Sequence, residues 1–519
     1  MLFDNCPRII ERHYGKIAVL LLFLFLLLAF FYMFLGPVNE DEGWYLYASK
    51  LVYQGKILYS DFSYTQTPLL PYVYGIPQLL FGTGLCLGRI TSLLFGIMTL
   101  VLCMVISNRL AGKLATVICG AAISLNLFAI YFLTITKTYS LTAFFLSVSI
   151  LFLVSKINKW VKYSFSTIFL CLAAGTRLSA ILAIPILLIY LLIFERENKR
   201  YFLLATITSL VTIAAIFLPF ILRDPELFWY NVVGFHMARY NASDLLHLIQ
   251  YKINTLSSIA RVFSFMMVSV VSGAVLFFVY NWRRMKKALL NHGIYVYLIG
   301  ILLIIFFSNC LPGGSYAEYQ VANLPLMAIL AGCIYSKYYE KSVTPEGKSV
   351  VLAIICVLLL LNLIGHGTHH VDISGRKLPL DEISRIADYI KEHIPKDEPI
   401  FTYHTYLAIQ SQRNVLPGLE MAIFSYYPEW DTQTAQRYHV TNNEIVKGLI
   451  TSQKAAAVIL TDLDFKRSAS YAPLDKEEQE HIRNDILTKI EEYYYLAKEM
   501  DSFGQWRDIV YVYLRKDRY

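Results

Sequence analysis

Residues 17–47 read IAVLLLFLFLLLAFFYMFLGPVNEDEGWYLY, a long apolar run that ends in a cluster of acidic and aromatic residues. An α-helix needs about 20 mostly apolar residues to cross the hydrocarbon core of a bilayer. The run 17–35 has that length and carries no charged side chain. The four residues after it (GPVN) lack the small-residue cleavage site of a signal peptide. We therefore expect 17–35 to be a retained membrane-spanning helix.

The same apolar character continues over most of the chain. The 519 residues are 56% hydrophobic and 16% charged, with a mean hydropathy of +0.49, whereas soluble domains carry about a quarter charged residues. This composition excludes a soluble globular enzyme and a disordered chain. Apolar runs predict about eleven spans, at roughly 17–35, 90–107, 114–132, 139–155, 163–175, 178–194, 201–221, 262–280, 293–308, 320–335 and 349–365.

Charge divides the chain near residue 365. Residues 1–365 hold 27 basic and 14 acidic side chains, whereas residues 366–519 hold 19 basic and 24 acidic ones. The excess of positive charge belongs to membrane loops, so it does not indicate nucleic-acid binding. Lys and Arg concentrate in the short segments that include the N-terminus, which predicts a cytoplasmic N-terminus and, with an odd number of spans, an extracytoplasmic tail. The absence of a retention signal favours a prokaryotic plasma membrane.

The predicted outer face carries the long segments. They are two loops, 36–89 and 222–261, and the tail 366–519. The tail is expected to be a small α/β domain, because helical patterns at 380–393, 443–452 and 476–493 alternate with strand-like runs at 399–403, 455–460 and 509–514. Residues 371–379 are the predicted linker. We therefore expect the functional site on this face.

The acidic cluster after the first span has two interpretations. Asn39 followed by Glu42 forms a capping box, and acidic side chains are favoured at a helix N-terminus. The capping interpretation explains Asn39 and Glu42 but not Asp41. A carboxylate held at a membrane surface is also suited to remove the proton from an attacking hydroxyl. The spacing alone leaves capping and catalysis equally open.

Several motifs together resemble the GT-C glycosyltransferases of the protein O-mannosyltransferase and aminoarabinose-transferase type. They are the acidic pair after the first span, Gly-x-x-x-Tyr-x-Asp at 55–61, and the Pro-Leu turn at 68–69. The turn GTRLSA at 175–180 is similar to the Arg-containing turn of that family, and YQVANLP at 319–325 to its Tyr-and-Pro motif. The resemblance extends along most of the chain and implies the GT-C fold.

The resemblance also implies a reaction. A polyprenyl-phosphate-linked sugar would be the donor, and an acceptor hydroxyl on a protein, lipid or glycan would attack the anomeric carbon with inversion. Asp41 would be the general base, with Glu42 as its helper or structural partner. Two departures stand out: Gln66-Thr67-Pro68-Leu69 replaces Lys-Pro-Pro-Leu, and Lys137 stands near where the family often has an acidic residue.

A leaving phosphate needs cationic donors, and Arg offers a bidentate fork. Four outward positions provide candidates: Arg89, Lys137, Arg177 and Arg239. The alternative for each is a side chain that reaches from a helix end to lipid headgroups. Arg177 is favoured as functional, because it interrupts a continuous apolar region where a charge is costly.

Four further residues are candidates for the substrate pocket: Asp61, Tyr64, Gln66 and His236. A turn role for Asp61 and Tyr64 is equally open, and for His236 a structural hydrogen bond is favoured over a role as a base. In the tail, His404, Asp462 and Asp464 stand at predicted strand ends. We expect the tail to shape access of the acceptor.

Other functions remain open at this stage. The eight cysteines show no metal or disulfide spacing, so no cofactor is indicated, and a divalent metal stays open. A transporter or lipid flippase would predict an internal repeat, which the hydropathy pattern lacks. A non-catalytic scaffold would tolerate loss of Asp41. A lipid-linked glycan ligase would perform related chemistry on another membrane fold.

Overall fold

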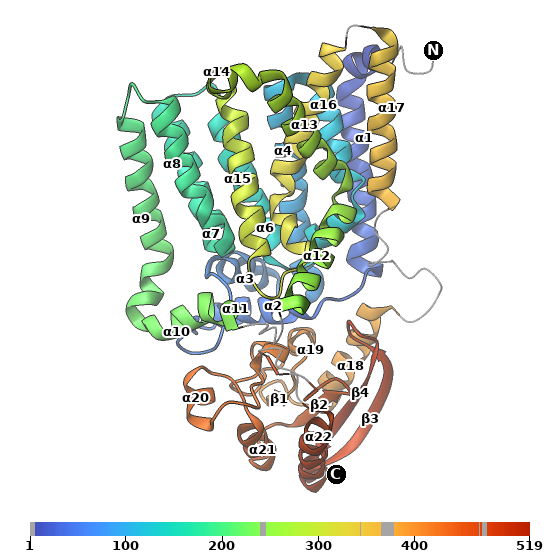
Figure 1. Ribbon diagram of the computed structural model, residues 1–519. Helices are drawn as coiled ribbons and strands as arrows, with labels where there is room; N and C mark the ends of the chain where they lie inside the picture. The colour runs from blue at the N-terminus through green and yellow to red at the C-terminus, as the bar shows by residue number, and fades with distance from the viewer. Residues whose placement is uncertain are drawn as a thin grey trace.

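The computed structural model describes residues 6–238, 245–342, 344–364, 378–466, 468–469 and 475–518. Long helices run side by side in one bundle, and a smaller α/β domain lies beneath one end of them (Figure 1). This confirms the expected fold class, a helical membrane protein with a C-terminal α/β domain. The predicted boundary at 365 and the predicted linker fall mostly on 365–377, outside the described residues.

Within the described ranges, seven helices are long and apolar enough to cross a membrane, or eight if one bent pair is a single span. The predicted number of eleven stays a prediction. Two expected spans, 90–107 and 114–132, begin in the two halves of one helical segment. The backbone of this segment is not helical at Ala111 and Gly112, and Gly112 takes a positive φ of 78°. The helices of the bundle are α1 (Cys6–Leu35), α4 (Leu85–Ser124), α5 (Leu127–Thr134), α6 (Thr138–Val154), α7 (Lys159–Thr176), α8 (Ala183–Phe194), α9 (Arg200–Arg223), α13 (Ser264–Asn281), α14 (Met285–Asn291), α15 (Gly293–Cys310), α16 (Leu324–Lys341) and α17 (Pro345–Ile364).

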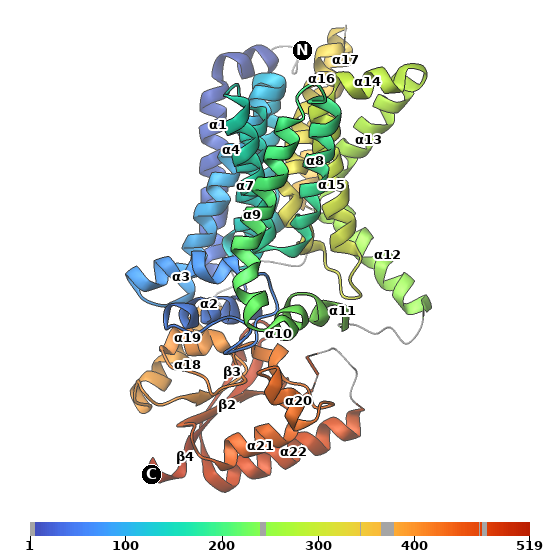
Figure 2. The ribbon, with the colours of Figure 1, turned by 90° about the vertical axis from the view of Figure 1, so that its left-hand side faces the viewer.

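Short elements cross the end of the bundle that faces the α/β domain (Figure 2). They are α2 (Glu40–Tyr53), α3 (Leu69–Phe81), η1 (Leu178–Leu182), α10 (Pro225–Trp229), η2 (Tyr230–Gly234), α11 (Phe235–Ala238), α12 (Leu245–Val262) and η4 (Ala317–Asn323). The pair α5 and α6 bends by 101° at the same end, because the polar residues 136–138 interrupt the apolar run there. Lys137 lies at this bend.

The C-terminal domain has a four-stranded sheet in the order β1-β2-β4-β3. β1 (Ile400–Phe401) pairs parallel with β2 (Ala457–Thr461), and the other neighbours are antiparallel. The strand β3 (Tyr494–Phe503) was not predicted, because its partly exposed, charged sequence lacks a clear apolar alternation. The other elements are α18 (Pro379–His393), α19 (Thr405–Ser411), α20 (Thr432–Arg437), α21 (Asn443–Thr451), α22 (Lys476–Tyr493) and β4 (Asp508–Arg515).

Helix α2 joins the two domains. The predicted capping box is present: Asn39 accepts a bond from the amide of Asp41 (3.1 Å), and its own amide donates to Glu42 Oε1 (3.1 Å). On the other side, α19 packs directly on Gly43, where an added Cβ would lie 2.3 Å from the amide nitrogen of Tyr406. The C-terminal domain therefore rests on the first turn of α2.

Candidate active site

Asp41 lies in the first turn of α2 and faces a cavity at the domain junction. Its Oδ1 accepts a hydrogen bond from the indole Nε1 of Trp44 (3.1 Å), and its Oδ2 lies 2.8 Å from Nζ of Lys137. The side chain keeps 24% of its surface exposed. The indole and the ammonium therefore fix the orientation of a carboxylate that solvent and substrate can still reach.

Lys137 bridges Asp41 to a second carboxylate. Its Nζ lies 2.6 Å from Oε1 of Glu318 in η4, and the hydroxyl of Tyr139 donates to the same oxygen at 3.0 Å. Glu318 was not predicted from sequence, although it directly precedes the YQVANLP motif. We name Asp41, Lys137 and Glu318 the cavity triad.

Glu42 has different surroundings from its neighbour. Arg89 donates to both of its carboxylate oxygens, from Nε at 2.8 Å and from Nη2 at 2.6 Å, and neither side chain is exposed. The same guanidinium donates to the carbonyls of Met33 (2.8 Å) and Pro37 (3.1 Å). We name Glu42 and Arg89 the sealed pair, since it fastens α2 to the ends of α1 and α4 and does not line the cavity.

The cavity has a volume of about 660 Å³ and two kinds of wall. Its polar wall is formed by Asp41, Thr65, Gln66, Tyr139, Arg177, Ser179, His236, Ser308, Asn309 and Tyr319. Its apolar wall is formed mainly by η1, η2, α11 and the start of the loop after α15, through Leu178, Ile181, Leu182, Val232, Val233, Phe235, Met237 and Leu311. This combination suits an amphiphilic ligand with a polar head and an apolar chain.

Arg177 ends α7 and reaches the polar wall. Its guanidinium lies over the rings of Tyr139 (5.1 Å) and Tyr319 (4.6 Å), and Nη1 donates to the hydroxyl of Thr138 at 3.3 Å. Its buried Nε has no hydrogen-bond partner in the described part of the chain. The two rings hold the guanidinium flat, which leaves hydrogen-bond donors for a ligand in the cavity.

The other predicted residues divide by location. Gln66 and His236 line the cavity, and Nε2 of His236 donates to the carbonyl of Thr65 at 2.8 Å. Asp61 is exposed and closes a turn, where it accepts the amide of Ile57 at 2.7 Å. Tyr64 is buried behind Trp44, outside the cavity wall. Arg239 lies outside the described residues.

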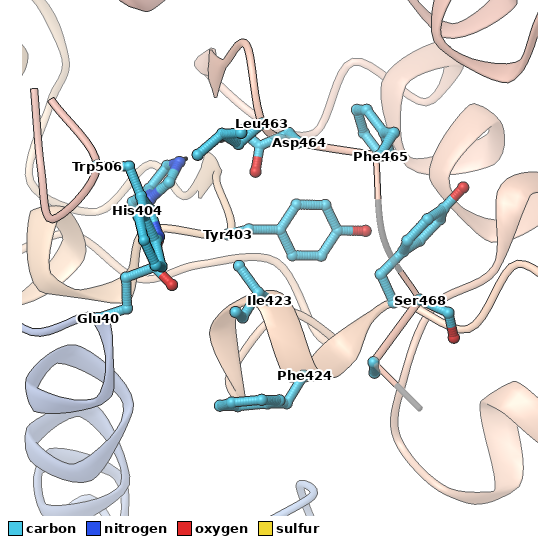
Figure 3. A pocket seen from close by; sticks show the side chains of 12 residues that line it. Glu40, Tyr403, His404, Ile423, Phe424, Leu463, Asp464, Phe465, Ser468 and Trp506 are labelled. Carbon is cyan, nitrogen blue, oxygen red and sulfur yellow. Dashed lines mark hydrogen bonds and ion pairs between the residues drawn. The ribbon is translucent and has the colours of Figure 1, made fainter. Parts of the chain in front are cut away.

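A second, smaller pocket of about 40 Å³ lies between α2 and the C-terminal domain. Figure 3 shows Glu40, contributed by α2, beside His404 of the C-terminal domain. Nε2 of His404 lies 3.3 Å from Oδ2 of Asp464. Burial lowers the pKa of His404, but the Asp464 carboxylate outweighs it, so the pKa lies above its ordinary value. Phe424 lines both cavities and is their common wall.

The triad is two carboxylates and an ammonium, so it does not supply a set of metal ligands. Among the residues that the structure describes, no group of three or more His, Cys, Asp or Glu side chains could hold a metal ion. The site is therefore built from two carboxylates, two cations and aromatic rings.

Comparison with known proteins finds likeness in structure alone. No family model matches the sequence, and no curated protein does. The fold is similar to that of ArnT from Cupriavidus metallidurans bound to undecaprenyl phosphate, with a TM-score of 0.60 and 14% identity over 95% of this chain and 97% of that one. It is also similar to the apo oligosaccharyltransferase of Archaeoglobus fulgidus (TM-score 0.55, 12% identity, 93% and 72% covered).

A third structure extends the likeness to a complex. AglB from Archaeoglobus fulgidus, bound to an inhibitory peptide and a dolichol-phosphate, matches with a TM-score of 0.51 and 11% identity over 94% of this chain and 74% of that one. All three similarities cover both the helical bundle and the C-terminal domain of this chain. The chain therefore has the fold of the GT-C glycosyltransferases, the family that the motifs of its first outer loop resemble.

Proposed function

We propose that this chain is a membrane glycosyltransferase that moves a sugar from a polyprenyl-phosphate donor to the hydroxyl of an acceptor. One observation carries the proposal: a carboxylate, Asp41, and a guanidinium, Arg177, line the same cavity of about 660 Å³, whose lining also includes many apolar side chains. The ArnT and AglB structures, which share the fold, hold undecaprenyl phosphate and a dolichol-phosphate.

The donor lipid enters the cavity with its phosphate toward Arg177. The guanidinium donates hydrogen bonds to the phosphate oxygens, and Tyr139 and Tyr319 keep its plane in place. The first isoprene units pack on the apolar wall at η1 and η2. Gln66 and His236 lie on the polar wall, where the sugar hydroxyls would be placed.

The chemical step is a displacement at the anomeric carbon. Asp41 takes the proton of the acceptor hydroxyl, and the acceptor oxygen forms a bond to the anomeric carbon. The bond from that carbon to the phosphate oxygen breaks, and its electron pair leaves with the polyprenyl phosphate, whose charge Arg177 stabilises. Attack from the face opposite the phosphate inverts the anomeric configuration.

The acceptor reaches Asp41 from the C-terminal domain. Glu40 and Asp41 are consecutive on α2, and each lines a different cavity, with Phe424 between them. The smaller pocket around His404 is placed to receive the part of the acceptor next to its attacking hydroxyl. By the positive-inside argument, this junction lies on the extracytoplasmic face.

The test is transfer by purified protein in lipid vesicles, with labelled polyprenyl-phosphate sugars as donors. We expect Asp41→Asn to lose about a thousandfold in turnover, because an amide cannot take the proton. The matched control is Asp388→Asn, an exposed carboxylate on α18, which should retain full activity. Turnover that survives in a folded Asp41→Asn variant would move the base elsewhere. The absence of turnover with mannose, glucose, galactose, arabinose and aminoarabinose donors would favour a transporter or scaffold.

A further inference from the structure

We infer that Lys137 is a built-in cation that occupies a two-carboxylate site formed by Asp41 and Glu318, so that the site works without a divalent metal. The occupancy of this site follows from geometry alone. Its catalytic consequence rests on the proposed glycosyltransferase function. The sequence makes Lys137 a candidate phosphate ligand, whereas in the structure its ammonium pairs with these two carboxylates and Lys137 is not among the residues that line the cavity.

The three groups come from distant parts of the chain. Asp41 belongs to α2, Lys137 to the bend between α5 and α6, and Glu318 to η4. The ammonium lies 2.8 Å from Asp41 Oδ2 and 2.6 Å from Glu318 Oε1, and the Lys137 side chain is only 5% exposed. One buried charge therefore ties three separate elements together beside Asp41.

The ammonium stands between two carboxylates, where a small cation would be attracted if the ammonium were removed. Divalent cations bind carboxylate oxygens at about 2.0–2.6 Å, depending on the ion. The two carboxylates stand on either side of the ammonium at only slightly longer distances, and neither side chain is fully buried, with 24% and 21% exposed. Without the ammonium, two negative groups would face each other in a partly dry site, and a small cation would be attracted into the space between them.

Lys137 acts on the reaction through its neighbours, as a positioning residue. It orients the Asp41 carboxylate from one side while Trp44 holds the other oxygen. Through Glu318 it also anchors η4, whose Tyr319 ring supports Arg177. Loss of Lys137 should therefore disturb the proposed base and the proposed phosphate ligand together.

Terbium luminescence tests the site without relying on catalysis. The Trp44 indole touches Asp41, so excitation of tryptophan should sensitise a Tb³⁺ ion bound between Asp41 and Glu318. We expect Lys137→Gln to bind Tb³⁺ at least about tenfold more tightly than the wild type, because the competing positive charge is gone. Adding Glu318→Gln should abolish the gain. Lys159→Gln, which removes a lysine paired with Glu195 elsewhere, should leave the signal unchanged.

Two results would overturn the inference in this assay. One is a folded Lys137→Gln protein, with wild-type elution and circular dichroism, whose Tb³⁺ affinity equals that of the wild type. The other is a wild-type signal that disappears in Glu318→Gln, since the site would then bind metal with Lys137 in place. If Lys137→Gln does not fold, Lys137→Arg should fold, keep the positive charge and show no gain in Tb³⁺ affinity.

Transfer assays then separate this inference from the proposed function. Wild-type turnover should be unchanged in excess EDTA, whereas Lys137→Gln should lose about 10- to 100-fold and recover in part with Mn²⁺ or Mg²⁺. Turnover of the wild type that EDTA abolishes would overturn the inference and keep the glycosyltransferase. Absence of turnover in every condition, together with the Tb³⁺ gain, would overturn the proposed function and keep the site.

Discussion

Asp41 and Glu42 are neighbouring carboxylates on one helix, and each is paired with a cation, yet their environments are opposite. Asp41 belongs to the cavity triad and remains 24% exposed, whereas Glu42 belongs to the sealed pair and is 0% exposed. In the sealed pair, the Arg89 guanidinium also donates to backbone carbonyls. The Glu42 carboxylate accepts hydrogen bonds from Asn39, Arg89 and Thr136. The comparison teaches that accessibility, rather than residue type, distinguishes the proposed base from a structural acid.

The sealed pair should control folding, whereas Asp41 should control turnover. Arg89→Met leaves Glu42 buried without its cation, and breaking a buried pair in this way costs about 3–5 kcal/mol. We expect a large fall in the thermal unfolding temperature of the detergent-solubilised protein. Asp41→Asn should lower it far less, because Lys137 keeps Glu318 as partner. Equal loss of stability in the two variants would break the comparison.

Arg177 should resemble Asp41 in this contrast and differ from Arg89. Its guanidinium makes one long hydrogen bond, to Thr138 at 3.3 Å, and stacks on two rings, so Arg177→Gln should cost less stability than Arg89→Met. Turnover should fall about 100-fold, because the leaving phosphate loses a charged donor. Arg284→Gln, an exposed arginine in η3 (Trp282–Arg284), is the control and should retain activity. Wild-type turnover of the donor by a folded Arg177→Gln variant would show that Arg177 does not bind the leaving phosphate.

Gly43, the next residue of α2, contacts the C-terminal domain. An added Cβ at Gly43 would meet the backbone of α19 at 2.3 Å, so Gly43→Ala must push the domains apart, at a cost of about 1–3 kcal/mol. We expect faster proteolysis at the junction and lower turnover. The control is Gly448→Ala in α21, where a Cβ meets nothing within 4 Å. Similar proteolysis of the two variants would show that α19 does not need this close contact.

The smallest effect is expected at the pocket beside Glu40. The pKa of His404 is raised above its ordinary value of 6.5, since the attraction of Asp464 outweighs burial. A raised pKa in the folded state stabilises the protein at pH values below 6.5, and this contribution is lost as the pH rises through the folded-state value. Unfolding between pH 5.5 and pH 8, as approximate limits, should show this loss of stability in the wild type and not in His404→Gln. An identical pH dependence in both proteins would contradict the assignment.

The sequence by itself determined the features that depend on neighbouring residues. The first span, the capping box at 39–42 and the helix at 476–493 follow from apolar length, side-chain reach and helical period, which act over a few residues. The same local patterns made the acidic cluster and Arg177 candidates for functional residues, and both Asp41 and Arg177 line the cavity.

Only the tertiary structure decided which acid and which cation line the cavity. Glu42 meets Arg89 across 47 positions and Lys137 meets Glu318 across 181, so no local spacing could separate Asp41 from Glu42 or predict Glu318. In the sequence, Arg89 and Lys137 fit the pattern of phosphate ligands. In the folded protein, each of them is paired with carboxylates of the chain itself. The physical reason is that a charge in a low-dielectric interior is stabilised by whatever opposite charge packing brings within about 3 Å, and packing joins distant segments.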